Sequence, residues 1–179
     1  MVDRPIRPLF PKDMRNDVCV TMTVMSLDPD CSPEIAGMIG ASLVTAVSDI
    51  PWNGPIGGVQ VGLVDGEIVL NPTQEQRKVS DLALTVAATM DKIVMIEAGA
   101  NQVDNDTMYR AIQLAHQENQ KQVALINQMV SEIGKPKFDY PTPTSIRSCS
   151  TRSWPTSWTR PRPPWIPTTR MSGRPAGTP

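Results

Sequence analysis

The stretch "IPWNGPIGGVQVGLVDGEIVLNPT", from Ile50 to Thr73, decides the fold class that the sequence predicts. Two runs rich in β-branched residues, 59–64 and 67–70, flank the dipeptide Asp-Gly, a common tight-turn sequence between antiparallel strands. The "GPIGG" segment lacks the spacing and the strand-to-helix context of a phosphate-binding loop, so we interpret it as a turn. The stretch therefore predicts a β-hairpin.

Two more strands and two helices are predicted after the hairpin. A short polar helix over 74–79 precedes the apolar runs "LALTVAAT" and "KIVMIEAG", which we expect to join the same sheet. A long helix follows over 104–134, with Asp104 and Asp106 near its start and Gly134 at its end. Its single apolar stripe, typical of a helix that packs on a core, consists of Met108, Ile112, Ala115, Val123, Ile126, Val130 and Ile133.

The region before the hairpin predicts one strand and one helix. Residues 17–27, "DVCVTMTVMSL", alternate in the manner of a strand with at least one buried face. A helical apolar pattern starts after Ser32, a preferred N-cap residue, and ends before Pro51. We expect Gly37 and Gly40 to allow this helix to pack closely on the sheet. Together these elements indicate an α+β fold, a β-sheet packed with helices and followed by a long helix.

Length and composition fit one globular domain, because 179 residues with 40% hydrophobic content can bury a sizeable core. No apolar run is long enough to cross a bilayer. The first residues carry charge and proline where a secretion signal needs apolar sequence. We therefore expect a cytoplasmic protein that does not enter a membrane.

The thiols and the single imidazole form no metal-binding or catalytic pattern. Cys19, Cys31 and Cys149 are scattered and odd in number, which indicates neither a disulfide framework nor a zinc site. His116 lies in the polar run "HQENQKQ", and we interpret it as a solvated helix residue. The sequence therefore predicts no catalytic residue and no metal ligand in this chain.

The net charge of −1 conceals an acidic body and a basic tail. Residues 141–179 contain six arginines and no acidic residue, which leaves 11 basic and 18 acidic residues in 1–140. The tail holds nine of the 18 prolines and has no apolar periodicity, so we expect it to be disordered. Its arginines and tryptophans suit phosphate pairing and base stacking, and its prolines suit a ligand for aromatic grooves.

The segment "DRPIRPLFP", from Asp3 to Pro11, places a proline directly after Arg4 and directly after Arg7. Proline disfavours helical conformations in the residue before it, so we expect both arginines to extend from a semi-rigid, extended strap. A guanidinium suits either a phosphate or a carboxylate, and a pre-set backbone lowers the entropy lost on binding. The strap therefore either binds an anionic ligand or is fixed to carboxylates of its own protein.

Five motifs occur in an order and at a spacing that resemble the bacterial polyribonucleotide nucleotidyltransferases: "DRPIRPLFP", "AGMIGAS", "IPWNGPIGGVQVG", "VLNPTQEQ" and "GKPKFDY". The resemblance runs from about residue 3 to about residue 140. It implies that residues 1–140 are the C-terminal portion of the first of two RNase PH-like core domains, with 141–179 as a separate tail.

The resemblance implies a phosphorolytic 3′-to-5′ exoribonuclease. In this family inorganic phosphate attacks the RNA 3′ end and releases nucleoside diphosphates, and the reverse reaction adds nucleotides. The family assembles as a homotrimeric ring, uses Mg²⁺ or Mn²⁺, and acts in messenger RNA degradation, where a larger RNA-degradation complex is a further expected partner. Arg4 and Arg7 would then contact RNA backbone phosphates.

The resemblance also implies that the chain is a fragment without activity of its own. The upstream strands with a Phe-Phe-Arg-type loop, the helical linker, the second core domain with the active site and two small RNA-binding modules are all expected in the parent. The family's Asp-x5-Asp-x-Lys pattern projects onto Arg77, Ala83 and Thr85, none of which can hold a metal ion or transfer the proton. Asp81 is interpreted as a structural or surface residue. We expect this part to supply ring architecture and RNA contacts.

Three alternatives stay open. The chain is either such a fragment, a non-catalytic RNA-binding or scaffolding subunit of an exosome-like ring, or an α+β binding module with accidental motif matches. For residues from about 141 onward we favour a shifted reading frame, because a one-base shift permits a back-translation into an acidic helical sequence. Loss of the opening strands is expected to expose unpaired sheet edges.

Overall fold

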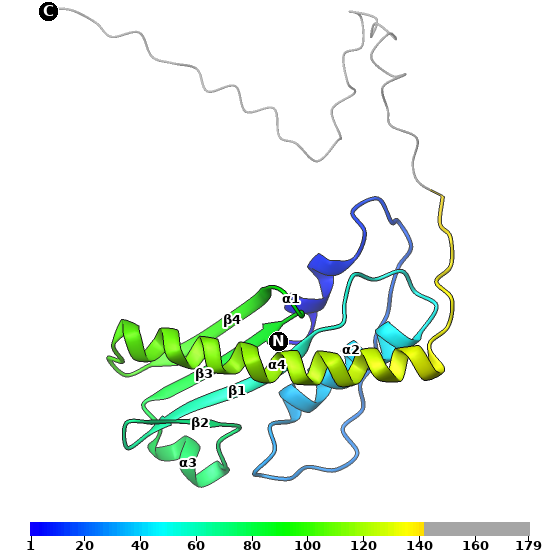
Figure 1. The fold of residues 1–179 in the computed structure, drawn as a ribbon. Coiled ribbons are helices and arrows are strands. Elements are labelled where there is room, and N and C mark those ends of the chain that lie inside the picture. The colour runs from blue at the N-terminus through cyan, green and yellow to red at the C-terminus, as the bar shows by residue number, and fades with distance from the viewer. Residues whose placement is uncertain (142–179) are drawn as a thin grey trace, which may run out of the picture. The chain divides into compact units, whose positions relative to one another are not determined.

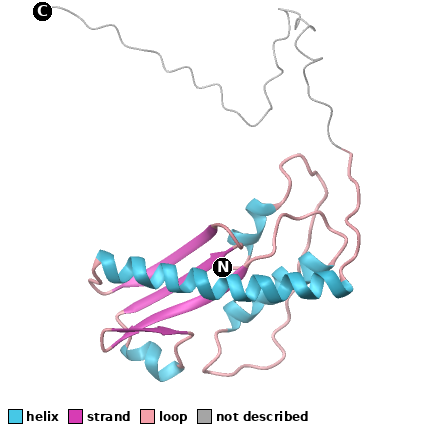
Figure 2. Cartoon of the chain, viewed as in Figure 1, coloured by secondary structure: helices cyan, strands magenta, loops and turns pink. Residues whose placement is uncertain are grey.

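A computed structural model of the chain describes residues 1–141, and the predictions for the tail and Cys149 lie outside these residues. Its centre is a four-stranded antiparallel sheet of order β2-β1-β3-β4, crossed by one long helix, α4 (Figures 1 and 2). The predicted α+β class is therefore confirmed. The strands are β1 (Gly57–Val64), β2 (Glu67–Leu70), β3 (Leu82–Ala88) and β4 (Ile93–Ala100).

The predicted hairpin forms as expected. Val64 pairs with Glu67 across the two-residue turn, and Asp65 and Gly66 adopt φ values of 51° and 81°. Positive φ at both central positions is characteristic of the type I′ turn, whose twist matches that of the strands. Strand β3 then pairs with β1, so the hairpin is one half of the sheet.

The long helix α4 (Asn105–Ile133) covers one face of the sheet (Figure 1). Asp104 caps its first turn, because Oδ2 accepts a hydrogen bond of 2.9 Å from the backbone N–H of Thr107. Ala115, Val123 and Ile126 of the predicted stripe are buried, and Met108, Ile112 and Val130 are partly buried. Ile133 at the helix end is 66% exposed. The core beneath α4 consists of Val59, Val61, Leu82, Leu84, Val86, Ala111 and Ala115.

The helix α2 (Pro33–Val47) packs against the opposite face near the start of β1. A Cβ at Gly58 would lie 2.7 Å from Sδ of Met38 in α2, so the absent side chain makes room for this helix. The expectation that Gly37 and Gly40 pack on the sheet is wrong, because Met22 and Val2 lie nearest to Gly37 and nothing lies within 4 Å of a Cβ at Gly40. The close approach depends on strand glycines.

Only part of the "GPIGG" segment lies outside the regular strands. Gly54 precedes a cis Pro55, whereas Gly57 and Gly58 begin β1. A Cβ at Gly57 would lie 2.9 Å from the backbone oxygen of Asn119, so α4 approaches the strand backbone closely here.

The predicted strand at 17–27 does not form. These residues form neither helix nor strand and are mostly exposed, and they pair with no strand within residues 1–141. Alternation supplies the side chains for a strand, but a strand also requires a hydrogen-bonded neighbour. The short helix α3 (Gln74–Val79) does form as predicted, with a capping box between Thr73 and Gln76. No helix within the described residues is long and apolar enough to span a bilayer.

Candidate functional site

Arg4 and Arg7 lie on two short helices, α1 (Asp3–Ile6) and the 3₁₀ helix η1 (Arg7–Leu9). The predicted extended strap is therefore wrong. Pro5 and Pro8 fall within the first turns of these helices, where a backbone N–H has no intrahelical acceptor to lose. The Trp52 side chain fixes this region to the body, because its Nε1 donates a 3.1 Å hydrogen bond to the carbonyl of Ile6.

Each of the two arginines binds a carboxylate of its own chain. Nη2 and Nε of Arg7 lie 2.9 and 3.0 Å from the two carboxylate oxygens of Asp3. Nη1 of Arg4 lies 3.2 Å from Oε2 of Glu97 on β4. The arginine side chains remain 77% and 65% exposed, so these ion pairs lie in water and stabilise the fold weakly.

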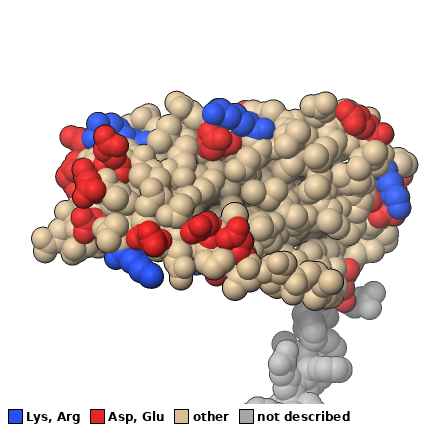
Figure 3. All heavy atoms as spheres, turned by 90° about the horizontal axis from the view of Figure 1, so that it is seen from below, with Lys and Arg blue, Asp and Glu red and all other residues tan. Residues whose placement is uncertain are grey.

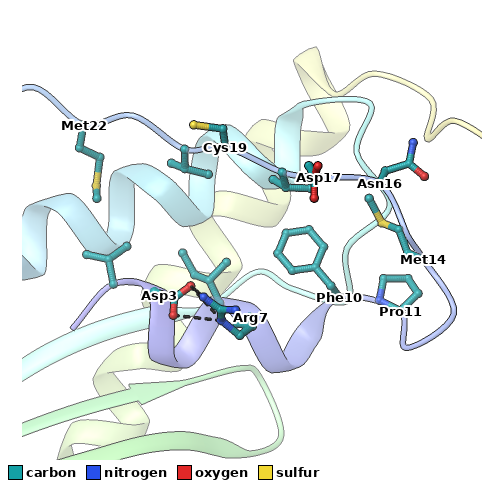
Figure 4. A pocket seen from close by; sticks show the side chains of 13 residues that line it. Asp3, Arg7, Phe10, Pro11, Met14, Asn16, Asp17, Cys19 and Met22 are labelled. Carbon is teal, nitrogen blue, oxygen red and sulfur yellow. Dashed lines mark hydrogen bonds and ion pairs between the residues drawn. The ribbon is translucent and has the colours of Figure 1, made fainter. Parts of the chain in front are cut away.

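A cleft of about 650 Å³ lies beside Arg7, between the two short helices and the extended segment 16–22 (Figure 4). Its charged lining residues are Arg7, Asp3 and Asp17, one cation against two carboxylates. That balance does not suit an anion, so the arginine contributes to the wall of the cleft without making it a phosphate cradle. The apolar wall includes Val2, Ile6, Phe10, Val18, Val20 and Met22.

Glu97, the partner of Arg4, shares one face of the sheet with two of the three projected catalytic positions, Ala83 and Thr85. Glu97 pairs with Thr85 across β3 and β4, so both side chains point to the same face. Ala83 lies two residues before Thr85 and therefore on that face as well. The Arg4–Glu97 ion pair thus lies on the sheet face of Ala83 and Thr85, whereas Arg7 lies at the cleft.

Arg77 and Asp81 are engaged in structural contacts. Nη2 of Arg77 donates to the carbonyl of Pro29, and Oδ1 of Asp81 accepts a 3.3 Å hydrogen bond from Asn101. Thr85 is 96% buried beneath its neighbours. Within residues 1–141 no three side chains of His, Cys, Asp or Glu come together in a way that could hold a metal ion.

The sequence analysis missed a polar site at Lys137. Nζ of Lys137 donates to the carbonyls of Ala46 and Ser48 at 2.7 and 2.6 Å, and it lies 3.4 Å from that of Thr45. Partial burial lowers the pKa of Lys137, and the nearby Asp49 carboxylate opposes that shift. The ammonium therefore binds the C-terminal carbonyls of α2. The lysine in "GKPKFDY" was the available signal, since cations favour helix C-termini.

The structure shows how far the histidine and two of the cysteines are exposed to solvent. His116 lies in helix α4 as predicted, but it is half-buried and its Nδ1 is buried and unpartnered within the described residues, so the interpretation as a solvated residue is wrong. Cys19 and Cys31 are free and exposed.

The surface in Figure 3 carries acidic and basic side chains interspersed with uncharged ones. No continuous basic patch covers this face of the described residues. Contact with a polyanion on this face would therefore depend on individual side chains and not on a broad positive field.

Comparisons with known proteins give one consistent family. A profile of the 3′ exoribonuclease family, domain 2, matches residues 54–118. The polyribonucleotide nucleotidyltransferase of Lachnoclostridium phytofermentans is 58% identical over 140 residues, which are 78% of this chain and 20% of that protein. The corresponding protein of Ruminiclostridium cellulolyticum is 59% identical, with the same shares covered.

A solved structure supports the fold. Rice Rrp46 superposes with a TM-score of 0.52 at 8% identity, over 59% of this chain and 51% of that chain. The chain spans about one fifth of the length of the curated relatives it matches. From the sequence identity and the shared RNase PH-like fold together, this chain belongs to the polyribonucleotide nucleotidyltransferase family.

Proposed function

We propose that this chain is part of a phosphorolytic 3′-to-5′ exoribonuclease in which it supplies ring architecture and RNA contacts and leaves bond cleavage to another part. The names of the relatives support the reaction class. A homotrimeric assembly, cytoplasmic location and association with an RNA-degradation complex belong to the same proposal.

The observation that carries the non-catalytic role is the chemistry of the sheet face around Thr85. Ala83 offers no ligand atom, Thr85 is buried, and the guanidinium of Arg77 is bound to a backbone carbonyl. Mg²⁺ prefers carboxylate and water oxygens in an octahedral arrangement. These three positions do not fit Mg²⁺ or the similar ion Mn²⁺.

The nearest carboxylate does not alter this conclusion. Glu97 lies on the same face, but its Oε2 faces the cationic Arg4 at 3.2 Å. One carboxylate already balanced by a guanidinium is a poor ligand set for a divalent ion. We expect inorganic phosphate, the co-substrate, to bind in a part of the parent enzyme that this chain does not cover.

Arg4 and Arg7 retain donors that are able to contact a phosphate backbone. Within residues 1–141, Nη1 of Arg7 makes no hydrogen bond, and Arg4 uses only its Nη1. Both side chains are mostly exposed. A guanidinium that holds a carboxylate on one edge is therefore available for a phosphate on the other.

The reaction assay tests the catalytic part of the proposal. The purified 179-residue chain, supplied with poly(A), inorganic phosphate and Mn²⁺, is expected to release no nucleoside diphosphate. A full-length relative under the same conditions is the positive control. Clear phosphate-dependent release by the chain alone would contradict a role limited to architecture and RNA contact.

A free-standing RNA-binding or scaffolding subunit is the alternative function. The flanking coding sequence separates the two. An upstream Phe-Phe-Arg loop and a downstream Asp-x5-Asp-x-Lys pattern in the same frame support the enzyme, whereas an independent start and stop support the subunit. Sequencing of the coding DNA also decides whether residues from 141 onward are out of frame.

A further inference from the structure

We infer that a hydrogen bond between Asp13 and Tyr140 is a latch that makes two distant segments of this chain open and close together. The first is the arginine segment, residues 3–14, which carries both arginines of the candidate site. The second is the exit segment, residues 135–140, which follows α4. The inference is independent of the proposed function, because it concerns how the chain holds these segments and not what it binds.

The latch joins two side chains that lie 127 residues apart in the sequence. Oη of Tyr140 donates a 2.9 Å hydrogen bond to Oδ1 of Asp13, and both residues are partly buried. This hydrogen bond raises the pKa of Tyr140, because it holds the phenolic proton against a carboxylate. Hydrogen bonds to charged groups are stronger than those between neutral groups, so the contact is able to hold two short segments together.

The exit segment is attached to residues 47–53, a stretch that begins at the end of α2 and that we call the anchor. The backbone N–H of Lys135 donates a 2.9 Å hydrogen bond to the carbonyl of Val47. Three residues later, the N–H of Phe138 donates a 2.8 Å hydrogen bond to the carbonyl of Asp49. The first half of the anchor therefore holds the exit segment.

The arginine segment is attached to the second half of the same anchor. Nε1 of Trp52 donates to the carbonyl of Ile6 at 3.1 Å, and the backbone N–H of Asn53 donates to that of Leu9 at 3.0 Å. In both segments the latch residue comes after the residues that bind the anchor. The latch therefore holds the outer end of each segment.

The anchor has hydrogen bonds that fix its own shape. Oγ of Ser48 donates a 2.8 Å hydrogen bond to the carbonyl of Thr45 and accepts one of 3.3 Å from the backbone N–H of Ile50. The N–H of Ser48 also donates to the carbonyl of Val44 in α2 at 3.0 Å. Opening is therefore expected in the two segments attached to the anchor and not in the anchor itself.

The outer ends of both segments have little regular structure to hold them. Residues 135–140 form neither helix nor strand, and the turn after Pro11 is closed by a 3.2 Å hydrogen bond from the N–H of Met14 to the Pro11 carbonyl. Segments of this kind open locally at a small cost in free energy. Because they share the latch, loss of one end also frees the other. By linkage, a ligand that fixes the arginine segment also stabilises the exit segment, and the reverse holds.

Amide hydrogen exchange of the 179-residue chain, followed by NMR, tests the inference. Tyr140→Phe removes only the hydroxyl that donates to Asp13. It is expected to raise exchange about threefold to tenfold at the N–H of Phe138 and also at the N–H of Met14 in the other segment. Tyr109→Phe on α4 is the matched control, because Tyr109 is 62% exposed and lies outside both segments.

The reverse substitution tests the same coupling from the other side. Asp13→Ala is expected to raise exchange at the N–H of Phe138 by a similar factor, whereas Asp91→Ala in the turn between β3 and β4 is not. The N–H of Asp81, bonded to the carbonyl of Leu63 at 3.0 Å, should exchange equally in all variants and so reports an intact fold. Faster exchange confined to the segment that carries the substitution, or no change in either segment, would overturn the inference.

A titration of Tyr140 measures the latch by a second route. The chain has two tyrosines, so Tyr109→Phe leaves Tyr140 as the only one that ionises. In that background Asp13→Ala is expected to lower the pKa of Tyr140 toward the usual tyrosine value of 10.0, and Asp91→Ala is expected to leave it unchanged. An identical pKa of Tyr140 with and without Asp13 would show that the latch does not form.

Discussion

Nη1 of Arg4 lies 3.2 Å from Oε2 of Glu97, and this ion pair joins the first helix of the chain to the outer strand of the sheet. Glu97 stands opposite Thr85, so the pair marks the sheet face that carries Ala83 and Thr85, two of the three projected catalytic positions. An arginine that was expected to point at RNA thus also has a structural partner 93 residues away. Both roles considered for Arg4, contact with an anion and an internal ion pair, therefore have a physical basis.

We expect the Arg4–Glu97 pair to contribute little to stability. A double-mutant cycle with Arg4→Ala and Glu97→Ala should give a coupling free energy of about 0.2–1 kcal/mol, because both side chains are largely in water. Urea unfolding of the four proteins measures it. A coupling above about 2 kcal/mol would mean that the pair is shielded from solvent.

The carboxylate of Asp3 should compete with RNA for Arg7. We expect Asp3→Asn to strengthen binding of a single-stranded RNA, because it releases the bidentate guanidinium, and Arg7→Gln to weaken it and flatten the salt dependence by about one phosphate contact. Binding isotherms over a salt series measure both effects. Glu118→Gln, which removes the ion pair with Lys121 on α4, is the matched control. Unchanged binding in the Asp3 and Arg7 variants would leave Arg7 with a purely structural role.

Gly57 should tolerate no side chain. Its Cβ would lie 2.9 Å from a backbone atom of Asn119, which cannot move aside as a flexible side chain could. We expect Gly57→Ala to lower the free energy of unfolding by about 1–3 kcal/mol. Gly99→Ala on β4 is the control, because nothing lies within 4 Å of the new Cβ, and its effect should stay within about 0.5 kcal/mol. Equal losses would show that strand propensity and not the helix contact decides the cost.

The locally encoded elements were predictable from the sequence, and their bounds are close to those observed. The hairpin, α3 and α4 each carry their own start, stop or turn signals, such as the Asp65-Gly66 turn and the Asp104 cap. The family's motifs also identified the fold. These signals act over a few residues, so they need no knowledge of the rest of the molecule.

The predictions that failed depend on distant partners. Segment 17–27 has the pattern of a strand, but pattern cannot supply the neighbouring strand. Arg4 and Arg7 precede prolines and were expected in extended backbone, yet burial of Ile6 and its contact with Trp52 hold this region in short helices. Likewise, only the fold brings Glu97 to Arg4 and Lys137 to α2, because these contacts span about half of the chain.

Lys137 should act as a cap on α2. We expect Lys137→Met to lower the free energy of unfolding by about 1–2 kcal/mol, since it removes a cation bound to the last carbonyls of the helix. Lys135→Met is the matched control, because only the backbone N–H of Lys135 contacts Val47. Chemical denaturation compares the two variants. Similar stability of both would show that the ammonium contacts are replaced by water at no cost.

Asp104 should make the start of α4 sensitive to acid. Hydrogen bonds from the side chain and backbone of Thr107 lower the pKa of Asp104 below its usual value of 3.8. Because the folded-state pKa is the lower one, the stabilisation is present above about pH 4 and is lost as pH falls through the folded-state pKa. Asp104→Asn keeps a capping oxygen that does not titrate, so its thermal midpoint should match the parent near pH 7 and fall less between pH 4 and pH 2. Asp104→Ala should unfold at a lower temperature at neutral pH. Melting curves of the three proteins that run parallel from pH 7 to pH 2 would show that this carboxylate does not control the acid response.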